Sequence, residues 1–387
     1  MIKKTMLLLI VCFLLFGCNE SKHEENQIKI GAIMELTGSI PAVGASSKNA
    51  AEMAVNEVNK NGGIVIGNKT LPVKLILEDD ADKGDQAAAA AQKLITKDDV
   101  LAIIGPNSSS GAIPAAEIAE SDQTVLITPW STNPKVTLDT QTNKPKQYVF
   151  RACFTDIFES RVLARFAYET LKAQTAAVLY DVASEAPSSQ AATFKDSFEK
   201  LGGKVVAFET YTTHDKDFSA QLTKIKAINP QVIFLPTYYN DVSLVAQQAK
   251  RLGLNVPFLG SDAWSSPDLI KLSNGAVEGS YFANHYSAEA ETPVTREFVE
   301  KYQKLYGKEP DDIAALTYDA FHFLFKAIAT SSSLDRQAVR NSISNLPMFE
   351  GVTGIIKFSP NSGDPDKTAV IMQVKGDKFV WIMNGQA

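Results

Sequence analysis

Hydroxyl side chains are concentrated in two loops that each directly follow a short apolar run. The first is residues 105–111 (GPNSSSG), and the second is residues 129–134 (PWSTNP). Hydroxyl groups and the free N–H groups at the start of a helix can bind a carboxylate. Further along, Asp262 follows another apolar run, and Tyr238 and Tyr239 add aromatic surface. An anion site that faces a carboxylate and aromatic rings suits a zwitterion with an apolar side chain.

The elements that must position these loops alternate between short apolar runs and helical patterns. The strands expected in the first half are residues 28–34, 73–77, 100–104 and 125–128. Those expected in the middle of the chain are residues 176–180, 205–208, 232–235 and 257–259. Such alternation predicts an α/β fold with parallel sheets that helices cover on both faces. Ligands of such sheets bind beyond the carboxyl ends of the strands, where the polar loops lie.

Composition excludes several classes of protein. The 387 residues predict two domains, possibly three. The formal charge of −6, without a long basic run, argues against a nucleic-acid partner. With 3 Cys and 4 His, the chain has neither a disulfide framework nor the ligands of a typical zinc site. We therefore expect no metal site.

The first 17 residues have the layout of a signal peptide. Lys3 and Lys4 precede an apolar stretch over residues 6–16, which is too short to span a membrane. Because the stretch ends in a small residue and Cys18, we expect cleavage before Cys18 and lipidation of its sulfur. The alternative is plain secretion. The polar residues 18–27 would form a tether, and Cys153 is expected to be a small buried residue.

Enzyme motifs are missing from the sequence. No G-x-S-x-G elbow is present, and no G-x-G-x-x-G follows a strand. The four His residues are dispersed, which argues against a Ser–His pair. We therefore expect no catalytic residues, no cofactor and no enzymatic activity.

Several motifs resemble one family of binding proteins. They are GAIMELTGSIPAVGASSKNAAEMAVNEVNKNGGI from residue 31, IIGPNSSS from 103, ITPWSTNP from 127, RACFTD from 151, AQQAKRLGL from 246, FLGSDAW from 258 and GVTGIIKFSPNSGD from 351. With them the whole mature chain resembles the solute-binding lipoproteins of branched-chain amino acid ABC transporters. The resemblance implies a periplasmic binding protein of type I, with two Rossmann-like lobes that close about a hinge of three crossovers.

The resemblance also implies where the lobes begin and end. Lobe 1 is expected to comprise residues 28–132 and 286–354, and lobe 2 residues 148–275 and 359–387. The three hinge crossovers would be residues 133–147, 276–285 and 355–358. We further expect a monomer outside the cytoplasm, in the periplasm or at the cell surface, held to a membrane by its lipid.

The family's binding roles are carried over to matching positions. Ser109 and Thr132 would bind the ligand carboxylate, and Asp262 would bind its ammonium together with the carbonyl of Trp130. The pocket would be completed by Ser131, Tyr238 and Trp264, with Asp156 supporting the site through water. Two positions depart from the family pattern, because Ala186 and Val43 stand where aromatic residues are common.

The sequence thus predicts a receptor that captures an amino acid, apolar or aromatic, and delivers it to an ABC permease. The alternative is a receptor or sensor of the same fold for a small amide, urea or aromatic acid.

Overall fold

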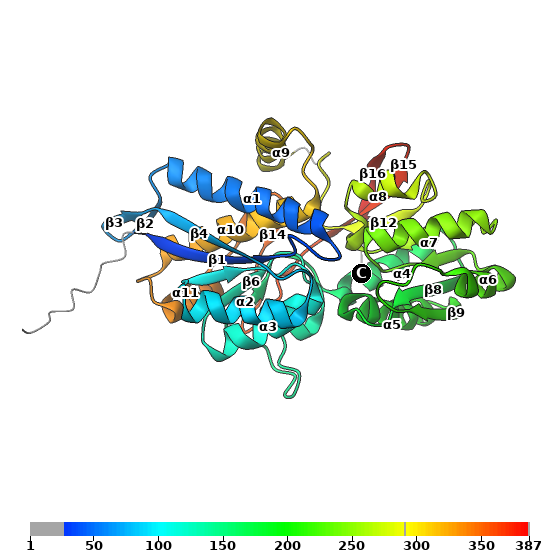
Figure 1. The fold of residues 1–387 in the computed structure, drawn as a ribbon, viewed down its shortest axis with the longest axis horizontal. Helices are drawn as coiled ribbons and strands as arrows, with labels where there is room; N and C mark the ends of the chain where they lie inside the picture. Colours follow the sequence, from blue (N-terminus) through cyan, green and yellow to red (C-terminus); the bar gives the residue numbers. More distant parts are fainter. Residues whose placement is uncertain (1–26, 290–291, 386–387) are drawn as a thin grey trace, which may run out of the picture.

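The computed structural model describes residues 27–289 and 292–385, which form two lobes that lie side by side (Figure 1). Each lobe is built around one sheet with helices on both faces. This confirms the predicted α/β fold class. Within the described residues, no helix is both long and apolar enough to cross a membrane.

Lobe 1 contains a parallel sheet of five strands. In spatial order they are β4 (Val73–Asp79), β1 (Ile28–Met34), β5 (Ala102–Ile104), β6 (Val125–Thr128) and β7 (Val149–Arg151). One face packs on α2 (Gly84–Thr96) and α3 (Ser109–Ser121). The other face packs on α1 (Pro41–Lys60), α10 (Asp312–Thr330) and α11 (Arg336–Asn345). The lobe therefore combines residues from the first two-fifths and the last quarter of the chain.

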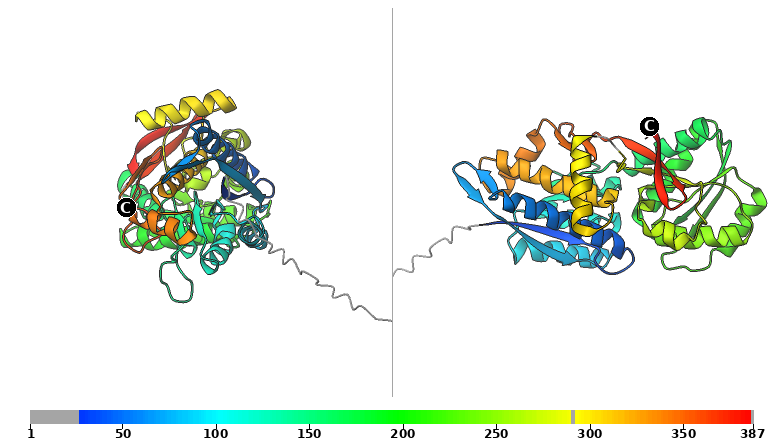
Figure 2. Two further views of the ribbon diagram at one scale, coloured as in Figure 1. Left: turned by 90° about the vertical axis from the view of Figure 1, so that its left-hand side faces the viewer. Right: turned by 90° about the horizontal axis from the view of Figure 1, so that it is seen from above.

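Short elements complete lobe 1. They are the hairpin β2–β3 (Ile64–Ile66, Lys69–Leu71), the hairpin β13–β14 (Phe349–Gly351, Gly354–Ile356), the 3₁₀ helix η1 (Pro134–Val136) and α9 (Pro293–Tyr306). Figure 2 shows α9 on the outer surface of the lobe, away from the sheet. Its buried residues, such as Phe298 and Tyr302, pack against α1 and α10.

Lobe 2 contains a mixed sheet of seven strands. In spatial order they are β16 (Lys378–Gly385), β15 (Ala369–Lys375), β12 (Tyr281–Asn284), β11 (Phe258–Gly260), β10 (Val232–Phe234), β8 (Thr175–Asp181) and β9 (Lys204–Tyr211). The covering helices are α4 (Asp156–Arg165), which continues as the π-helical turn η2 (Phe166–Thr170), α5 (Glu185–Lys200), α6 (Ser219–Ile228), α7 (Tyr239–Arg251) and α8 (Asp268–Ser273). The 3₁₀ helix η3 (Asp262–Trp264) follows β11 directly. β15 pairs antiparallel with both β12 and β16, and the other pairings within this sheet are parallel.

The chain crosses between the lobes at other places than the sequence suggested. Residues 148–151 were expected in lobe 2, but β7 pairs with β6 in the lobe 1 sheet. Residues 133–147 fold back over lobe 1, where the Lys146 ammonium donates to the carbonyls of Lys135, Val136 and Leu138 at 2.8–3.2 Å. This segment, with its Pro and Asn residues, is a loop that packs on lobe 1 and does not connect the lobes.

The other two expected crossovers also lie inside a lobe. Residues 281–284 form β12 of the lobe 2 sheet. Residues 355–358 stay with lobe 1, where the Phe358 ring contacts Phe150 at 5.4 Å between centroids. The connections therefore lie at about residues 152–155, after β7, at about residues 285–288, after β12, and at about residues 365–368, before β15.

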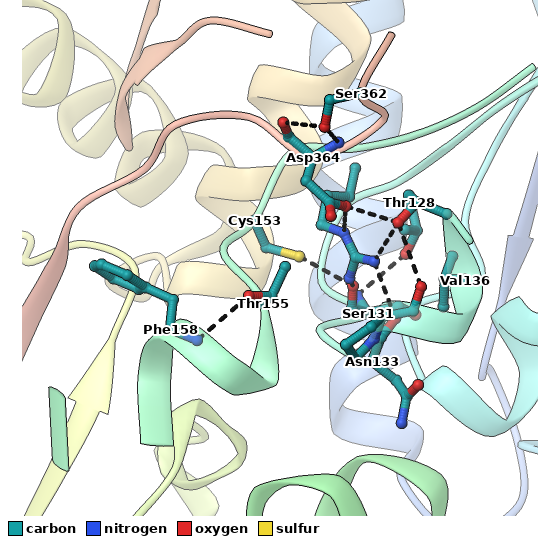
Figure 3. Close-up of polar contacts among 12 residues, drawn as sticks. Thr128, Ser131, Asn133, Val136, Cys153, Thr155, Phe158, Ser362 and Asp364 are labelled. Carbon is teal, nitrogen blue, oxygen red and sulfur yellow. Dashed lines mark hydrogen bonds and ion pairs between the residues drawn. The ribbon is translucent and has the colours of Figure 1, made fainter. Parts of the chain in front are cut away.

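Arg151 links the chain segments that precede the first and the third of these connections. Its guanidinium is fully buried and donates to the carbonyl of Ser131, to that of Asn133 at 2.9 Å and to the Asp364 carboxylate at 2.6 Å. Figure 3 shows that Ser131 and Asn133, in the loop after β6, converge with Asp364, which lies shortly before β15. Burial of such an ion pair is costly unless its donors are satisfied, as they are here. The hinge region is thus tied to the backbone on both sides of Thr132.

Candidate functional site

A small cavity lies between the two lobes at the carboxyl ends of their strands. From lobe 1 it is lined by Asn107, Ser109, Trp130 and Thr132, and from lobe 2 by Ala186, Pro187, Gln190, Tyr238, Asp262 and Ala263. About 10 Å³ of it is open to the centre of a water-sized sphere, which is space for about one water molecule. Among these lining residues Asp262 is the one charged side chain. Five of the residues predicted from the sequence therefore meet here: Ser109, Trp130, Thr132, Tyr238 and Asp262.

The Ser109 loop is held in place by Glu35, at the end of β1. The Glu35 carboxylate accepts the backbone N–H groups of Asn107 and Ser108, each at 2.8 Å. Ser108 is the N-cap of α3, and its hydroxyl accepts the N–H of Gly111 at 3.3 Å. Gly105 begins this loop at φ +98°, where a Cβ would lie 2.1 Å from the Ile33 carbonyl oxygen. The chain can therefore place the Ser109 hydroxyl at the start of a helix, which favours an anionic ligand.

The second lobe 1 loop follows β6. Thr132 lines the cavity, and its carbonyl accepts the Asp156 N–H at 2.8 Å. The Asn133 N–H donates to the Ser109 hydroxyl at 3.3 Å, which links the two loops. The Ser131 hydroxyl instead donates to the Asn107 carbonyl at 2.7 Å. Ser131 is thus placed to brace the two loops rather than to line the cavity, contrary to our expectation.

Asp262 is the first residue of η3 and is almost fully buried. Its carboxylate contacts the His285 imidazole, with Oδ2 at 2.9 Å from Nε2. Its backbone N–H donates to Glu159 at 2.6 Å, and the other oxygen of Glu159 accepts the Gln190 amide at 2.6 Å. Burial lowers the pKa of His285, although the hydrogen bond to Asp262 opposes this. A neutral imidazole that donates from Nε2 would orient the Asp262 carboxylate without neutralising its charge.

Further carboxylates crowd this end of the cleft. Burial raises the pKa of Asp156 to about 7, with a further increase from the charge of Asp262. Neither carboxylate oxygen of Asp156 has a hydrogen bond of good geometry, although the hydroxyls of Thr132 and Ser189 lie close enough to oppose the shift. Burial and the charge of Asp262 also raise the pKa of Glu159 well above its ordinary value. These buried acidic residues disfavour an anionic ligand group next to Asp262 and favour a positively charged one.

The structure does not bring all predicted residues to the cavity. Trp264 is fully buried in lobe 2, where its indole N–H donates to the Leu235 carbonyl at 3.1 Å. Its ring covers Gly260, since a Cβ there would lie 2.1 Å from the ring. Trp264 is therefore a core residue rather than part of the pocket. Val43 likewise packs into the lobe 1 core, while Ala186 does line the cavity.

Four contributing residues were not identified from the sequence. His285 and Glu159 contact Asp262 directly, and Gln190 donates to Glu159. Asp312 accepts a hydrogen bond from each lobe. Each has an ordinary local sequence context, and its role depends on contacts with distant segments. Cys153 is free and buried, as predicted.

The two lobes are closed on each other. The Asn240 amide of lobe 2 donates to the Ser39 carbonyl of lobe 1 at 3.3 Å. The Asn133 amide donates to the Glu185 carbonyl at 2.9 Å, and the Lys135 ammonium lies 2.7 Å from the Glu185 carboxylate. The cavity is therefore enclosed by contacts that require both lobes.

Comparison with known proteins agrees with this architecture. The sequence profile of the family "Periplasmic binding protein" matches residues 27–378. A leucine-, isoleucine-, valine-, threonine- and alanine-binding protein of Pseudomonas aeruginosa is 28% identical over 332 residues, which are 86% of this chain and 85% of that protein. The crystal structure of a leucine-binding protein of Thermotoga maritima matches with a TM-score of 0.86 at 35% identity, over 92% of this chain and 98% of that one.

A second solved structure carries a ligand. It is the substrate-binding protein of the branched-chain amino acid transporter of Streptococcus pneumoniae in complex with isoleucine. It matches with a TM-score of 0.84 at 28% identity, over 92% of this chain and 99% of that one. The family profile and these relatives agree with the two closed lobes and the polar loops at their strand ends. The chain belongs to the periplasmic binding protein family and resembles its branched-chain amino acid members.

Proposed function

We propose that this protein is a lipid-anchored receptor that captures an amino acid with an apolar side chain and delivers it to an ABC permease. One observation carries the proposal: Ser109 and Thr132 of lobe 1 and Asp262 of lobe 2 line one small cavity between the lobes. The two hydroxyls would bind the ligand carboxylate, and Asp262 would bind its ammonium through charge-assisted hydrogen bonds. Relatives named for leucine, isoleucine, valine, threonine and alanine support this ligand class.

Delivery would depend on the two lobes. A ligand that contacts both lobes stabilises the closed state, since the open state can offer only half of its contacts. The permease would then receive the closed, loaded form outside the cytoplasm. The proposal includes no chemical step, and none of the roles assigned to Ser109, Thr132 or Asp262 needs a cofactor.

A thermal-shift screen of the twenty amino acids tests the ligand class. A ligand at 100 times its Kd should stabilise the protein by about 2.7 kcal/mol. We expect apolar amino acids to give the larger shifts and glutamate, lysine and arginine to give little or none. If no amino acid shifts the unfolding temperature, the proposal fails.

One observation favours a second candidate, a receptor for a small amide, urea or aromatic acid. The Asp262 carboxylate already has a partner in His285, so an ammonium is not needed to satisfy it. The same screen, extended to benzoate, small amides and urea, separates the two candidates.

The membrane anchor rests on the sequence alone, because residues 1–26 lie outside the described part of the chain. We propose that Cys18 becomes the lipidated N-terminus. In a detergent-partition assay, Cys18→Ala should move the protein from the detergent phase to the aqueous phase. Cys153→Ala is the matched control, since Cys153 is buried within the fold. Unchanged partition of Cys18→Ala would remove the lipid anchor from the proposal.

A further inference from the structure

A buried carboxylate, Asp312, connects the two lobes beside the cavity. It is the first residue of α10 and has no exposed surface. One of its oxygens accepts the indole N–H of Trp130 at 3.1 Å, within lobe 1. The other oxygen accepts the hydroxyl of Ser265, which belongs to lobe 2. Asp312 is not the cap of α10, because the Asp311 side chain accepts the N–H of Ala314 at 2.9 Å. Its own carboxylate is therefore available for these two donors.

Trp130 occupies the space in which a ligand side chain would be expected. Its ring, 4% exposed, meets the ring of Tyr238 from the opposite lobe at 6.1 Å between centroids. The neighbouring lining residues Ala186, Pro187 and Ala263 are small and would by themselves leave room for a large side chain. With the indole in place, the cavity has space for about one water molecule. Any amino acid must therefore widen the cavity, and because the indole lies between the lobes, the widening required grows with the size of the ligand side chain.

The indole cannot turn away without a penalty. Rotation of Trp130 would break its hydrogen bond and leave one oxygen of a buried carboxylate without a partner, which is costly. A ligand too large for the cavity would instead hold lobe 2 away from lobe 1 and separate Ser265 from Asp312. Either response removes a donor from the same buried carboxylate. Large ligands are thus disfavoured through closure as well as through direct contact.

We infer that Trp130, held by Asp312, limits the ligand to amino acids with small uncharged side chains, such as alanine, serine and glycine. The inference rests on the proposed function of amino acid capture and replaces its apolar ligand class by a class defined by small size, which includes serine. Trp130 acts by contact with the ligand, and Asp312 is a positioning residue that acts through Trp130 and Ser265.

Calorimetric titration of the full chain with alanine, serine, glycine, leucine, isoleucine and phenylalanine tests this inference. The parent protein should bind alanine or serine more than about tenfold tighter than leucine, because a few misplaced methylene groups cost at least that much. Trp130→Ala should reduce this preference by at least about tenfold and extend binding to leucine and isoleucine. Trp381→Ala is the matched control, since it removes an indole that is 44% exposed on β16.

Asp312→Asn provides a second measurement with a smaller change in shape. The two donors approach different oxygens, so an amide would present its nitrogen to one of them. This variant should lower the ratio of alanine to leucine affinity, which a purely structural role would leave unchanged. Ser265→Ala should weaken binding of alanine, serine and glycine more than binding of leucine, isoleucine and phenylalanine, because only ligands that allow full closure gain this contact.

The outcomes separate the inference from the proposed function. Tighter binding of leucine than of alanine by the parent would overturn the size limit and leave an amino acid receptor in place. An unchanged ratio in folded Trp130→Ala or Asp312→Asn would also overturn it. If none of the six amino acids binds, the inference fails, and the proposed function fails with it if none of the twenty amino acids shifts the unfolding temperature.

Discussion

Replacement of Asp262 by Asn tests the charge that should recognise the ligand ammonium. The substitution keeps the shape of the side chain and removes a carboxylate that is 3% exposed. Loss of one partner from a desolvated charge pair typically costs about 2–5 kcal/mol. Because His285 lies 2.9 Å from this carboxylate and shares its hydrogen bonding, we expect about 2–3 kcal/mol. That corresponds to a roughly 30- to 150-fold increase in Kd.

The same substitution should have the opposite effect on the ligand-free protein. The negative charge of Asp262 is the second cause, after burial, of the raised pKa of Glu159. An amide at position 262 relieves this repulsion, so the unfolding temperature without ligand should stay the same or rise. A simple folding defect would lower both the affinity and the unfolding temperature, which makes the two explanations distinguishable.

Calorimetry with the best ligand of the thermal-shift screen measures the affinity, and scanning calorimetry measures the unfolding temperature. Asp268→Asn is the matched control, because it makes the same charge change at an exposed position in the first turn of α8. If Asp262→Asn binds that ligand as tightly as the parent does, no ammonium lies at Asp262. A receptor for an amide or an organic acid would then be the better description.

Three further predictions concern stability. Burial raises the pKa of Glu35 to about 8, so the native state keeps a proton that the unfolded state releases near pH 4.5. The unfolding free energy should therefore fall as the pH rises from about 4.5 to 8. Glu35→Gln should flatten this dependence in urea titrations. Arg151→Met leaves Asp364 without its buried partner and should lower the unfolding free energy by about 3 kcal/mol, the low end for such pairs because Asp364 is partly exposed; a loss below 1 kcal/mol would contradict this. Gly260→Val should prevent folding or lower the unfolding temperature strongly, since Trp264 covers the site of its Cβ, and normal expression with parental stability would show that the ring can move.

The strands of both sheets were largely predictable, whereas the points of crossover were not. Segments such as β1 and β5 are short, mostly buried runs rich in Ile and Ala between polar loops, and this pattern is local. The residues of β7, VFR, are buried as well, but only their pairing with β6 decides to which sheet they belong. A pattern of apolar residues identifies a strand and does not identify its neighbour.

The candidate site was predictable where it depends on the loops after strands. Ser109 and Thr132 lie in the loops after β5 and β6, which the parallel sheet of lobe 1 brings to one edge, and Asp262 lies just after β11 at the corresponding edge of the lobe 2 sheet. The partners that orient them were not predictable, because they come from distant segments. Trp130 and Asp312, for example, are 182 residues apart in the chain. Trp264 was misassigned because its position after β11 is that of a ligand residue, while its ring turns back over Gly260.

The divided composition of each lobe has a consequence for biosynthesis. In lobe 1, one face of the first sheet is covered by α10 and α11, which lie in the last fifth of the chain. In lobe 2, the edge of β12 is paired by β15, which comes later still. A chain that emerges from the ribosome with its N-terminus first therefore cannot complete either core until synthesis is almost finished. Contacts over such sequence separations also form slowly. Each lobe would thus stay incompletely folded until the last segments of the chain have been made.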